Sequence, residues 1–296
     1  MIRLGGPVFL GDTTKGAGAA ESHGSSADDP VLLAKAHKKK GYRAGYVPNI
    51  PIEDTVTIAK TRKAFEDEDV LLSEVGYWDN LLDTDPGVRK KNRKEMLDSF
   101  ALAEEIGANC VVGLAGSFCH GGVITEHTAQ SFSDEAFEEV VEMARNFIDT
   151  IKPKTAHFTY EFYQFGVVDS VESVAKLIAA VDREMFGVHL DLTNLANSPR
   201  NYWRTGQLMK ECIKAFGGRI VAAHAKDAIM KAPSITVQFE EVIPGRGNID
   251  IASILRELNK LPGEIPYLME HLDTEDEYDI AAAHIRGVAA REGVSL

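Results

Sequence analysis

The sequence predicts a single (β/α)8 TIM barrel that occupies residues 1–296 as one α/β domain. Three observations support this fold. Eight apolar or β-branched runs alternate with helical patterns, no linker or repeat divides the chain, and metal-ligand-type side chains recur at the ends of successive runs. Strands that alternate with helices are typical of parallel α/β folds, because each helix returns the chain to the start of the next strand.

Short runs with strand composition set the expected barrel. They cover residues 2–10, 42–48, 70–78, 110–117, 156–165, 186–194, 220–227 and 266–272. An open doubly wound sheet is the alternative, and it usually has a GxGxxG turn after its first strand. The segment LGGPVFLGDTTKGAG contains glycines at that place but no such motif, so the barrel is favoured.

The segments between these runs show apolar residues at helical spacing and have recognisable ends. Asp85 and Pro86 are typical of a helix start, and Gly107 stops the pattern that follows. Asp169 and Glu172 are expected to form a capping box. The other expected helices follow Pro30, Pro51 and Ser133, or begin at Thr205, Asp250 and about Glu275.

Four long segments without periodicity follow expected strands, at about residues 11–29, 118–132, 195–204 and 228–249. In a barrel they would be the loops of the catalytic face. The first is rich in Gly, Ser and Ala, and two interpretations stay open for it: a lid over the site, or plain disorder.

Composition limits the classes of function. A net charge of −13 argues against a nucleic-acid surface, and the basic runs HKKK and RKKNRK are interpreted as solvated helix faces. No apolar run approaches the ~20 residues of a membrane span, and the start lacks the pattern of a signal peptide. The three cysteines form no CxxC motif, which favours core thiols and a cytoplasmic protein.

Four residues at strand ends form the candidate metal site: Glu161, Asp191, His224 and Glu270. The gaps between them are 30, 33 and 46 residues, about the length of a strand-plus-helix unit. They are therefore expected on neighbouring parallel strands, at one rim of the barrel. Burying such groups is costly unless they are paired or bind a metal, so the two interpretations are a metal site and a network of buried ion pairs.

Three carboxylates and one imidazole leave two positions of an octahedron free. This ligand set favours Mn²⁺, with Mg²⁺, Co²⁺ or Zn²⁺ as alternatives. Two adjacent hydroxyl or carbonyl oxygens of a substrate would fill the two free positions.

Five motifs carry a resemblance that extends over the whole chain: TYEFY (159–163), HLDLTN (189–194), AHAKD (223–227), PGRGNID (244–250) and YLMEH (267–271). The sequence resembles the xylose isomerase-like TIM barrel superfamily, in the branch of sugar isomerases and epimerases similar to ketose 3-epimerases. The resemblance implies that Glu161, Asp191, His224 and Glu270 bind one divalent metal. It also implies that Glu161 and Glu270 are the catalytic acid/base pair.

The expected activity is a sugar isomerase or epimerase that moves a proton next to a carbonyl through a metal-stabilised enediolate. The sequence departs from the ketose 3-epimerases at Asn194, where they have a His, and at Met230, where they have an Arg. The alternative is therefore a metal-dependent lyase or dehydratase acting on an oxidised (keto) sugar or glycoside. Two further hypotheses are a barrel that binds sugar or a partner without turnover and a DNA-repair nuclease, which would need a His-rich multi-zinc site and a basic groove.

Five residues are candidates for contacts to the substrate: Trp78, His120, Asn194, Lys226 and Arg246. Aromatic rings stack on sugars but also fill barrel mouths, and an arginine in a loop either binds an oxygen or braces the loop. Lys226 is expected either to orient a substrate oxygen or to form an ion pair with Asp227 or Glu270. A homo-oligomer stays open, because no interface is legible in the sequence.

Overall fold

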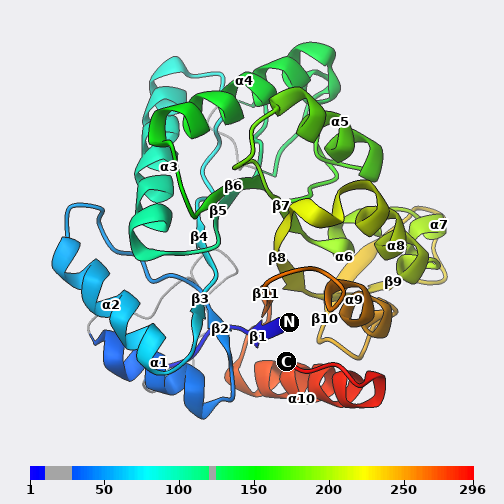
Figure 1. Ribbon diagram of the computed structural model, residues 1–296. Helices are drawn as coiled ribbons and strands as arrows, with labels where there is room; N and C mark the ends of the chain where they lie inside the picture. Colours follow the sequence, from blue (N-terminus) through cyan, green and yellow to red (C-terminus); the bar gives the residue numbers. More distant parts are fainter. Residues whose placement is uncertain (11–28, 120–124) are drawn as a thin grey trace.

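The computed structural model describes residues 1–10, 29–119 and 125–296 of the chain. Its parallel strands form a central ring that is enclosed by helices (Figure 1). The strands of this ring are β1 (Ile2–Gly5), β2 (Ala44–Gly45), β3 (Leu71–Leu72), β4 (Glu74–Gly76), β5 (Cys110–Gly113), β6 (His157–Tyr160), β7 (Val188–Leu190), β8 (Ile220–Ala225) and β11 (Ile265–Met269).

Two sheets make up the ring. One has the order β3-β2-β1-β11-β8-β7 and the other has the order β4-β5-β6. β3 and β4 are parts of one extended segment that is interrupted at Ser73, so together they occupy one barrel position. Isolated parallel bridges, one of them between Glu161 and His189, connect the segment of β6 to that of β7. All eight expected strands are therefore present, and the predicted TIM barrel is confirmed.

Ten α-helices follow the strands in the described residues. They are α1 (Pro30–Lys39), α2 (Thr55–Asp67), α3 (Pro86–Ile106), α4 (Asp134–Ile151), α5 (Val171–Val181), α6 (Leu192–Leu195), α7 (Pro199–Tyr202), α8 (Thr205–Phe216), α9 (Ile251–Leu258) and α10 (Glu275–Glu292). Two short 3-10 helices, η1 (Ala129–Phe132) and η2 (Gly217–Arg219), complete the set.

Helix ends follow the chemistry of the sequence at most positions. The Asp85 side chain accepts hydrogen bonds from the first turn of α3, and Gly107 ends that helix with φ 80°, in the left-handed region that glycine tolerates. The expected capping box of α5 was placed one residue too early. Ser170 caps this helix and Ser173 completes the box, because the hydroxyl of each serine accepts a hydrogen bond from the backbone N–H of the other.

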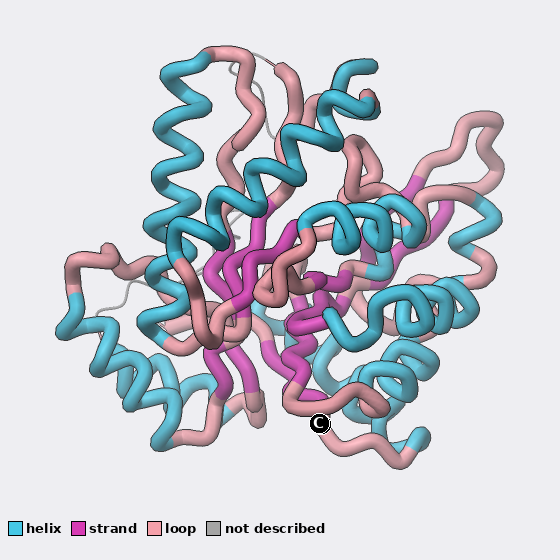
Figure 2. The backbone as a smooth tube through the Cα atoms, turned by 45° about the horizontal axis from the view of Figure 1, so that its top comes forward, coloured by secondary structure: helices cyan, strands magenta, loops and turns pink. Residues whose placement is uncertain are grey.

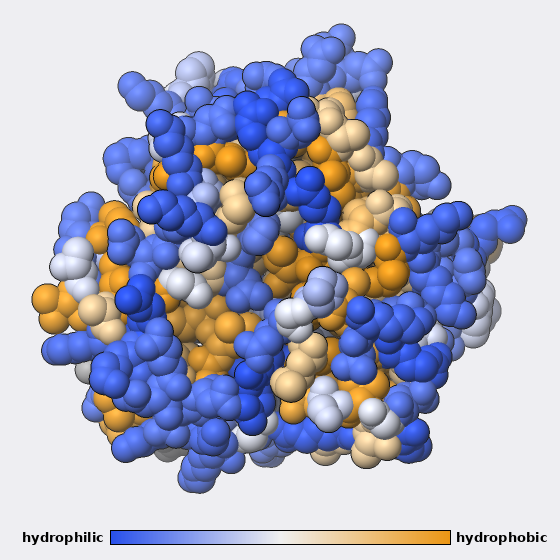
Figure 3. Space-filling model, viewed as in Figure 1, coloured by the Kyte–Doolittle hydropathy of each residue, from blue (hydrophilic) through white to orange (hydrophobic). Residues whose placement is uncertain are grey.

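The core lies between the strands and the surrounding helices. Phe158 of β6 is at its centre, with ring centroids 5.3 Å from Phe147 and 5.7 Å from Phe100. Hydrophilic residues cover most of the outer helices, whereas the apolar residues seen in Figure 3 lie mainly toward the middle of the ring and between helices. Among the helices of the described residues, none combines the length and the apolar character needed to cross a membrane.

The expected loop after the seventh strand of the barrel contains a hairpin. β9 (Asp227–Met230) pairs antiparallel with β10 (Phe239–Val242), so that Asp227 faces Val242 and Met230 faces Phe239. Figure 2 shows this hairpin reaching outward from the ring of helices. Its β10 strand returns the chain toward the mouth of the barrel.

Candidate metal centre

The carboxyl ends of four neighbouring strands bring the four predicted ligands together. Glu161 follows β6, Asp191 follows β7, His224 belongs to β8 and Glu270 follows β11. Each offers one ligand atom, and these four atoms all lie within 4.8 Å of one another. All four side chains are buried, Asp191 completely. Consecutive parallel strands end at the same rim, so the spacing along the chain becomes closeness in space.

The His224 ring is contacted by carboxylates at both of its nitrogens. Nδ1 lies 3.0 Å from Glu161 Oε1 and 2.7 Å from Glu270 Oε1. Nε2 lies 3.1 Å from Oε1 of Glu74, whose Oε2 lies 2.8 Å from His189 Nε2. An imidazole held at one nitrogen by a carboxylate presents its other nitrogen in a fixed direction, as metal-binding histidines do.

Sequence reasoning missed Glu74, which is fully buried in β4. Burial alone would raise the pKa of this carboxyl group, but the two histidines beside it hold the pKa well below its ordinary value. The available signal was a lone acid in the interior of the expected strand at 70–78, two residues before Gly76 and four before Trp78 on the same face.

The two carboxylate oxygens of Asp191 have different contacts. Its Oδ1 accepts hydrogen bonds from the backbone N–H groups of Thr193 and Asn194, at 2.9 and 3.1 Å, and so caps α6. Its Oδ2, like Glu270 Oε1, is buried and makes no hydrogen bond of good geometry among the described residues, although the Lys226 ammonium lies 2.8 and 2.5 Å from these two oxygens. Two such oxygens that face a third carboxylate and an imidazole fit a divalent cation, because carboxylate oxygens and imidazole nitrogens are its usual ligands.

Lys226 supplies a positive charge inside this cluster. Its Nζ lies 2.8 Å from Asp191 Oδ2, 2.5 Å from Glu270 Oε1 and 3.8 Å from Glu161 Oε1. Of the two ion pairs expected for Lys226, the structure forms the one with Glu270. Asp227 instead accepts backbone hydrogen bonds from the turn that contains Arg246.

The two proposed acid/base residues differ electrostatically. Burial raises the pKa of Glu161 above its ordinary value. Burial acts on Glu270 in the same direction, but the nearby positive charges of His224 and Lys226 outweigh it and hold its pKa well below the ordinary value. A pair of carboxyl groups whose pKa values are pushed apart is suited to one acid and one base.

The structure places the other predicted substrate contacts at various distances from this cluster. The Asn194 side-chain amide donates to Phe162 O at 2.9 Å and approaches Glu161 Oε1 at 3.5 Å, so it braces the segment after β6. Arg246 is exposed in the turn before α9. His120 lies outside the described residues, as does most of the segment considered as a lid.

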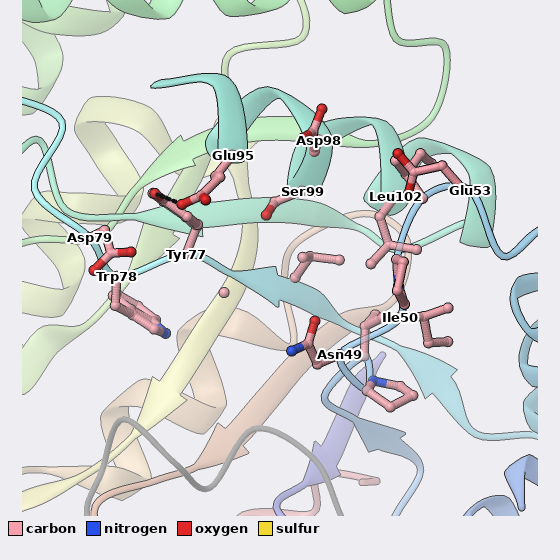
Figure 4. A pocket seen from close by; sticks show the side chains of 16 residues that line it. Asn49, Ile50, Glu53, Tyr77, Trp78, Asp79, Glu95, Asp98, Ser99 and Leu102 are labelled. Atoms are coloured by element: carbon pink, nitrogen blue, oxygen red, sulfur yellow. Dashed lines mark hydrogen bonds between the residues drawn. The ribbon is translucent and has the colours of Figure 1, made fainter. Parts of the chain in front are cut away.

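Trp78 lies in the wall of a neighbouring cavity of about 740 Å³ between the loop after β2 and helix α3 (Figure 4). The Tyr77 hydroxyl donates to Glu95 Oε2 at 3.0 Å in the same wall. The indole of Trp78 lies against Gly76, where an added Cβ would be only 2.6 Å from Nε1. None of the four proposed ligands lines this cavity.

A family model described as a xylose isomerase-like TIM barrel matches residues 39–288. The chain belongs to this family. No curated protein matches the sequence. The resemblance carried by the five motifs is therefore confirmed at the level of the family.

Solved structures share the fold at low sequence identity. A xylose isomerase-like TIM barrel protein from Mycobacterium smegmatis, in complex with magnesium, has a TM-score of 0.66 and 16% identity over 96% of this chain and 99% of its own. D-psicose 3-epimerase from Clostridium cellulolyticum H10 has a TM-score of 0.63 and 14% identity, over 90% of this chain and 94% of its own. A probable 3-DHS dehydratase from Bacillus anthracis has a TM-score of 0.61 and 12% identity, over 87% of this chain and 92% of its own.

Proposed function

We propose that the protein is a divalent-metal-dependent sugar isomerase or epimerase. The observation that supports this function best is the convergence of Glu161, Asp191, His224 and Glu270 on one buried point at the carboxyl ends of the strands. That end of the barrel is where enzymes of this fold have their active sites. The net charge of −13 argues against the basic surface that a nuclease would need.

The roles of the residues follow from their positions. A bound divalent cation would polarise the substrate carbonyl and offset the charge that develops when a neighbouring carbon loses its proton. Glu161 follows β6 and Glu270 follows β11, and both carboxylates approach Nδ1 of His224. One carboxylate would remove the proton and the other would return one, to the opposite face in epimerisation or to the adjacent carbon in isomerisation.

A metal-dependent lyase or dehydratase acting on a keto sugar or glycoside is the second candidate. The position of Asn194 favours it, because its amide is engaged by Phe162 O and Glu161. The resemblance places a substrate-contacting histidine there in ketose 3-epimerases. Met230 lies in β9, where the resemblance expects an arginine. Both candidates share the removal of a proton next to a carbonyl and differ in what leaves afterwards.

Proton exchange in D₂O tests the shared step. The Mn²⁺-loaded protein is incubated with a panel of ketoses and 3-keto sugars, and deuterium incorporation is followed by NMR. We expect exchange with at least one sugar, its loss in Glu161→Gln and in Glu270→Gln, and its retention in Glu240→Gln, a control on the exposed hairpin. Exchange that persists in both active-site variants would refute the proposal.

Product analysis then separates the two candidates. An epimer or an aldose–ketose pair supports the isomerase or epimerase. An unsaturated product, or a released aglycone, supports the lyase.

A further inference from the structure

Lys226 occupies an unusual position for a lysine. Its side chain is only 3% exposed, and its ammonium lies within 4 Å of four carboxylates. Three of these belong to the proposed metal ligands, and two of the contacts, to Asp191 Oδ2 and Glu270 Oε1, are shorter than 3 Å. Lys226 is the cation that contacts both of these oxygens, and Glu270 Oε1 also lies 2.7 Å from His224 Nδ1.

The same two oxygens are needed by a divalent cation. An ion bound to Glu270 Oε1 at the ~2.2 Å typical of carboxylate ligands would lie within about 5 Å of Nζ, which is itself 2.5 Å from that oxygen. Two positive charges this close, in a site screened from water, repel one another strongly. The ammonium and the ion therefore compete for the cage.

Glu241 offers the ammonium another place. It lies on β10 of the hairpin, its side chain is 40% exposed, and it is not one of the four proposed ligands. Its Oε1 is 3.7 Å from Lys226 Nζ, while its Oε2 lies 2.7 Å from His271 Nδ1. His271 thus holds one oxygen of Glu241, and the other faces Lys226 from the rim side of the cage.

We propose that Lys226 is a resident cation that neutralises the cage in the metal-free protein and moves onto Glu241 when a divalent ion binds. Glu241 is then a positioning residue for the displaced ammonium, which stays at the mouth of the cage within reach of a substrate oxygen. This inference rests on the proposed metal-dependent function. It assigns the hairpin β9–β10 a part in the site, although most of the hairpin lies outside the barrel.

The flexible four-carbon stem of lysine allows such a movement. Lys226 follows β8 and its ammonium is the mobile end of the side chain, whereas the ligand His224 is fixed inside the strand. Its carboxylate partners come from four different segments, so no single element ties the ammonium to the cage.

Metal binding measured by titration calorimetry with Mn²⁺, without substrate, tests the competition. We expect Lys226→Met to bind Mn²⁺ at least tenfold more tightly than the wild type, and Glu241→Gln to bind it several-fold more weakly. Lys231→Met and Glu240→Gln, which remove a surface ion pair of the same hairpin, should leave the affinity unchanged. In EDTA, Lys226→Met should also melt at a lower temperature, because its carboxylates lose their cation.

A double-mutant cycle separates displacement from a general effect of charge. If Glu241 acts by receiving the ammonium, then Glu241→Gln has no effect on Mn²⁺ affinity once Lys226 is Met. If Glu241 acts only as a nearby negative charge, or through His271, its effect persists in the Lys226→Met background and the inference is overturned. If Lys226→Met folds poorly, the Mn²⁺ affinity of Glu241→Gln alone still tests the inference, because this substitution lies at the rim of the cage.

The outcomes distinguish this inference from the proposed function. A wild-type protein that binds no Mn²⁺, Mg²⁺, Co²⁺ or Zn²⁺ would overturn both. A wild-type protein that binds Mn²⁺, with Lys226→Met binding it no more tightly, would overturn only the exchange of Lys226 for the metal.

Discussion

The Glu74 carboxylate lies 3.1 Å from Nε2 of His224, at the ring nitrogen opposite to the one that contacts Glu161 and Glu270. Glu74 also reaches His189 at 2.8 Å and is fully buried. It therefore fixes the orientation of the imidazole from inside the barrel. Such a carboxylate also raises the basicity of the nitrogen that remains for a metal.

Replacing Glu74 by Gln should weaken metal binding roughly 10- to 100-fold, the usual cost of losing the carboxylate behind a metal-binding histidine. The amide has the shape of the carboxylate but not its charge, and it can accept from only one of the two histidines. Titration calorimetry with Mn²⁺ measures the change. Glu95→Gln, a partly exposed residue that contacts Tyr77 and Lys91, is the control. Equal affinities in wild type and Glu74→Gln would contradict the role given to Glu74.

The contrast between Glu74 and the four proposed ligands shows what the sequence can reveal. Glu161, Asp191 and Glu270 each come directly after an apolar run, and a parallel barrel places such ends together. Glu74 lies at the start of β4, in the interior of an expected strand, and its function depends on which side chains face it across the barrel. That relationship arises from the closure of the ring and leaves no spacing in the sequence.

Asp227 organises the turn that precedes α9. Its Oδ1 accepts from the N–H groups of Ala228 and Ile249, and its Oδ2 accepts from those of Gly245 and Gly247, each at 2.9 Å. In Asp227→Asn, an NH₂ group would face two of these donors. We expect a loss of about 3 kcal/mol or more in the free energy of unfolding, since hydrogen bonds to a charged acceptor contribute about 1.5–3 kcal/mol each.

Urea denaturation at neutral pH measures the effect of Asp227→Asn. Asp273→Asn, on the exposed segment before α10, is the control for a simple loss of charge. A loss below about 1 kcal/mol would show that the turn is held by other contacts.

The hairpin marks a second limit of the sequence. The sequence predicts a long segment without periodicity at about 228–249, but its residues alternate too weakly to predict β9 and β10. The structure brings Glu241 of β10 back to Lys226 through this hairpin. Whether a residue of this hairpin reaches the site depends on the register in which its two strands pair. That register is weakly specified by the sequence of the hairpin alone.

Gly76 determines where Trp78 lies. A Cβ at residue 76 would be 2.6 Å from Nε1 of Trp78, so Gly76→Ala must displace the indole. The chain has two tryptophans, and in a Trp203→Phe background the fluorescence reports Trp78 alone. We expect a red-shifted emission and stronger acrylamide quenching in Gly76→Ala, with a stability loss of about 1–3 kcal/mol from overpacking. An unchanged spectrum would show that the glycine is not needed for the position of the indole.

His37 should make stability depend on pH. Burial lowers the pKa of this histidine from 6.5 to about 4. The Leu33 carbonyl oxygen, 2.9 Å from Nδ1, acts in the opposite direction and raises the pKa, but burial outweighs it. The folded protein therefore keeps the ring neutral at a pH where the unfolded chain binds a proton. The contribution of His37 to the free energy of unfolding is fully present above pH 6.5 and falls progressively as the pH drops toward 4. Below pH 4 this group causes no further change.

The difference between the two pKa values corresponds to roughly 3 kcal/mol in the free energy of unfolding. Urea denaturation of wild type and His37→Gln at several pH values between 4 and 7 isolates this contribution, because only the wild type carries the titrating ring. The variant should be less stable at pH 7, since it loses the packing of the imidazole against Gly45 and Phe65. Its deficit should shrink as the pH falls, and a deficit that stays constant over this range would mean that His37 is not held neutral by burial.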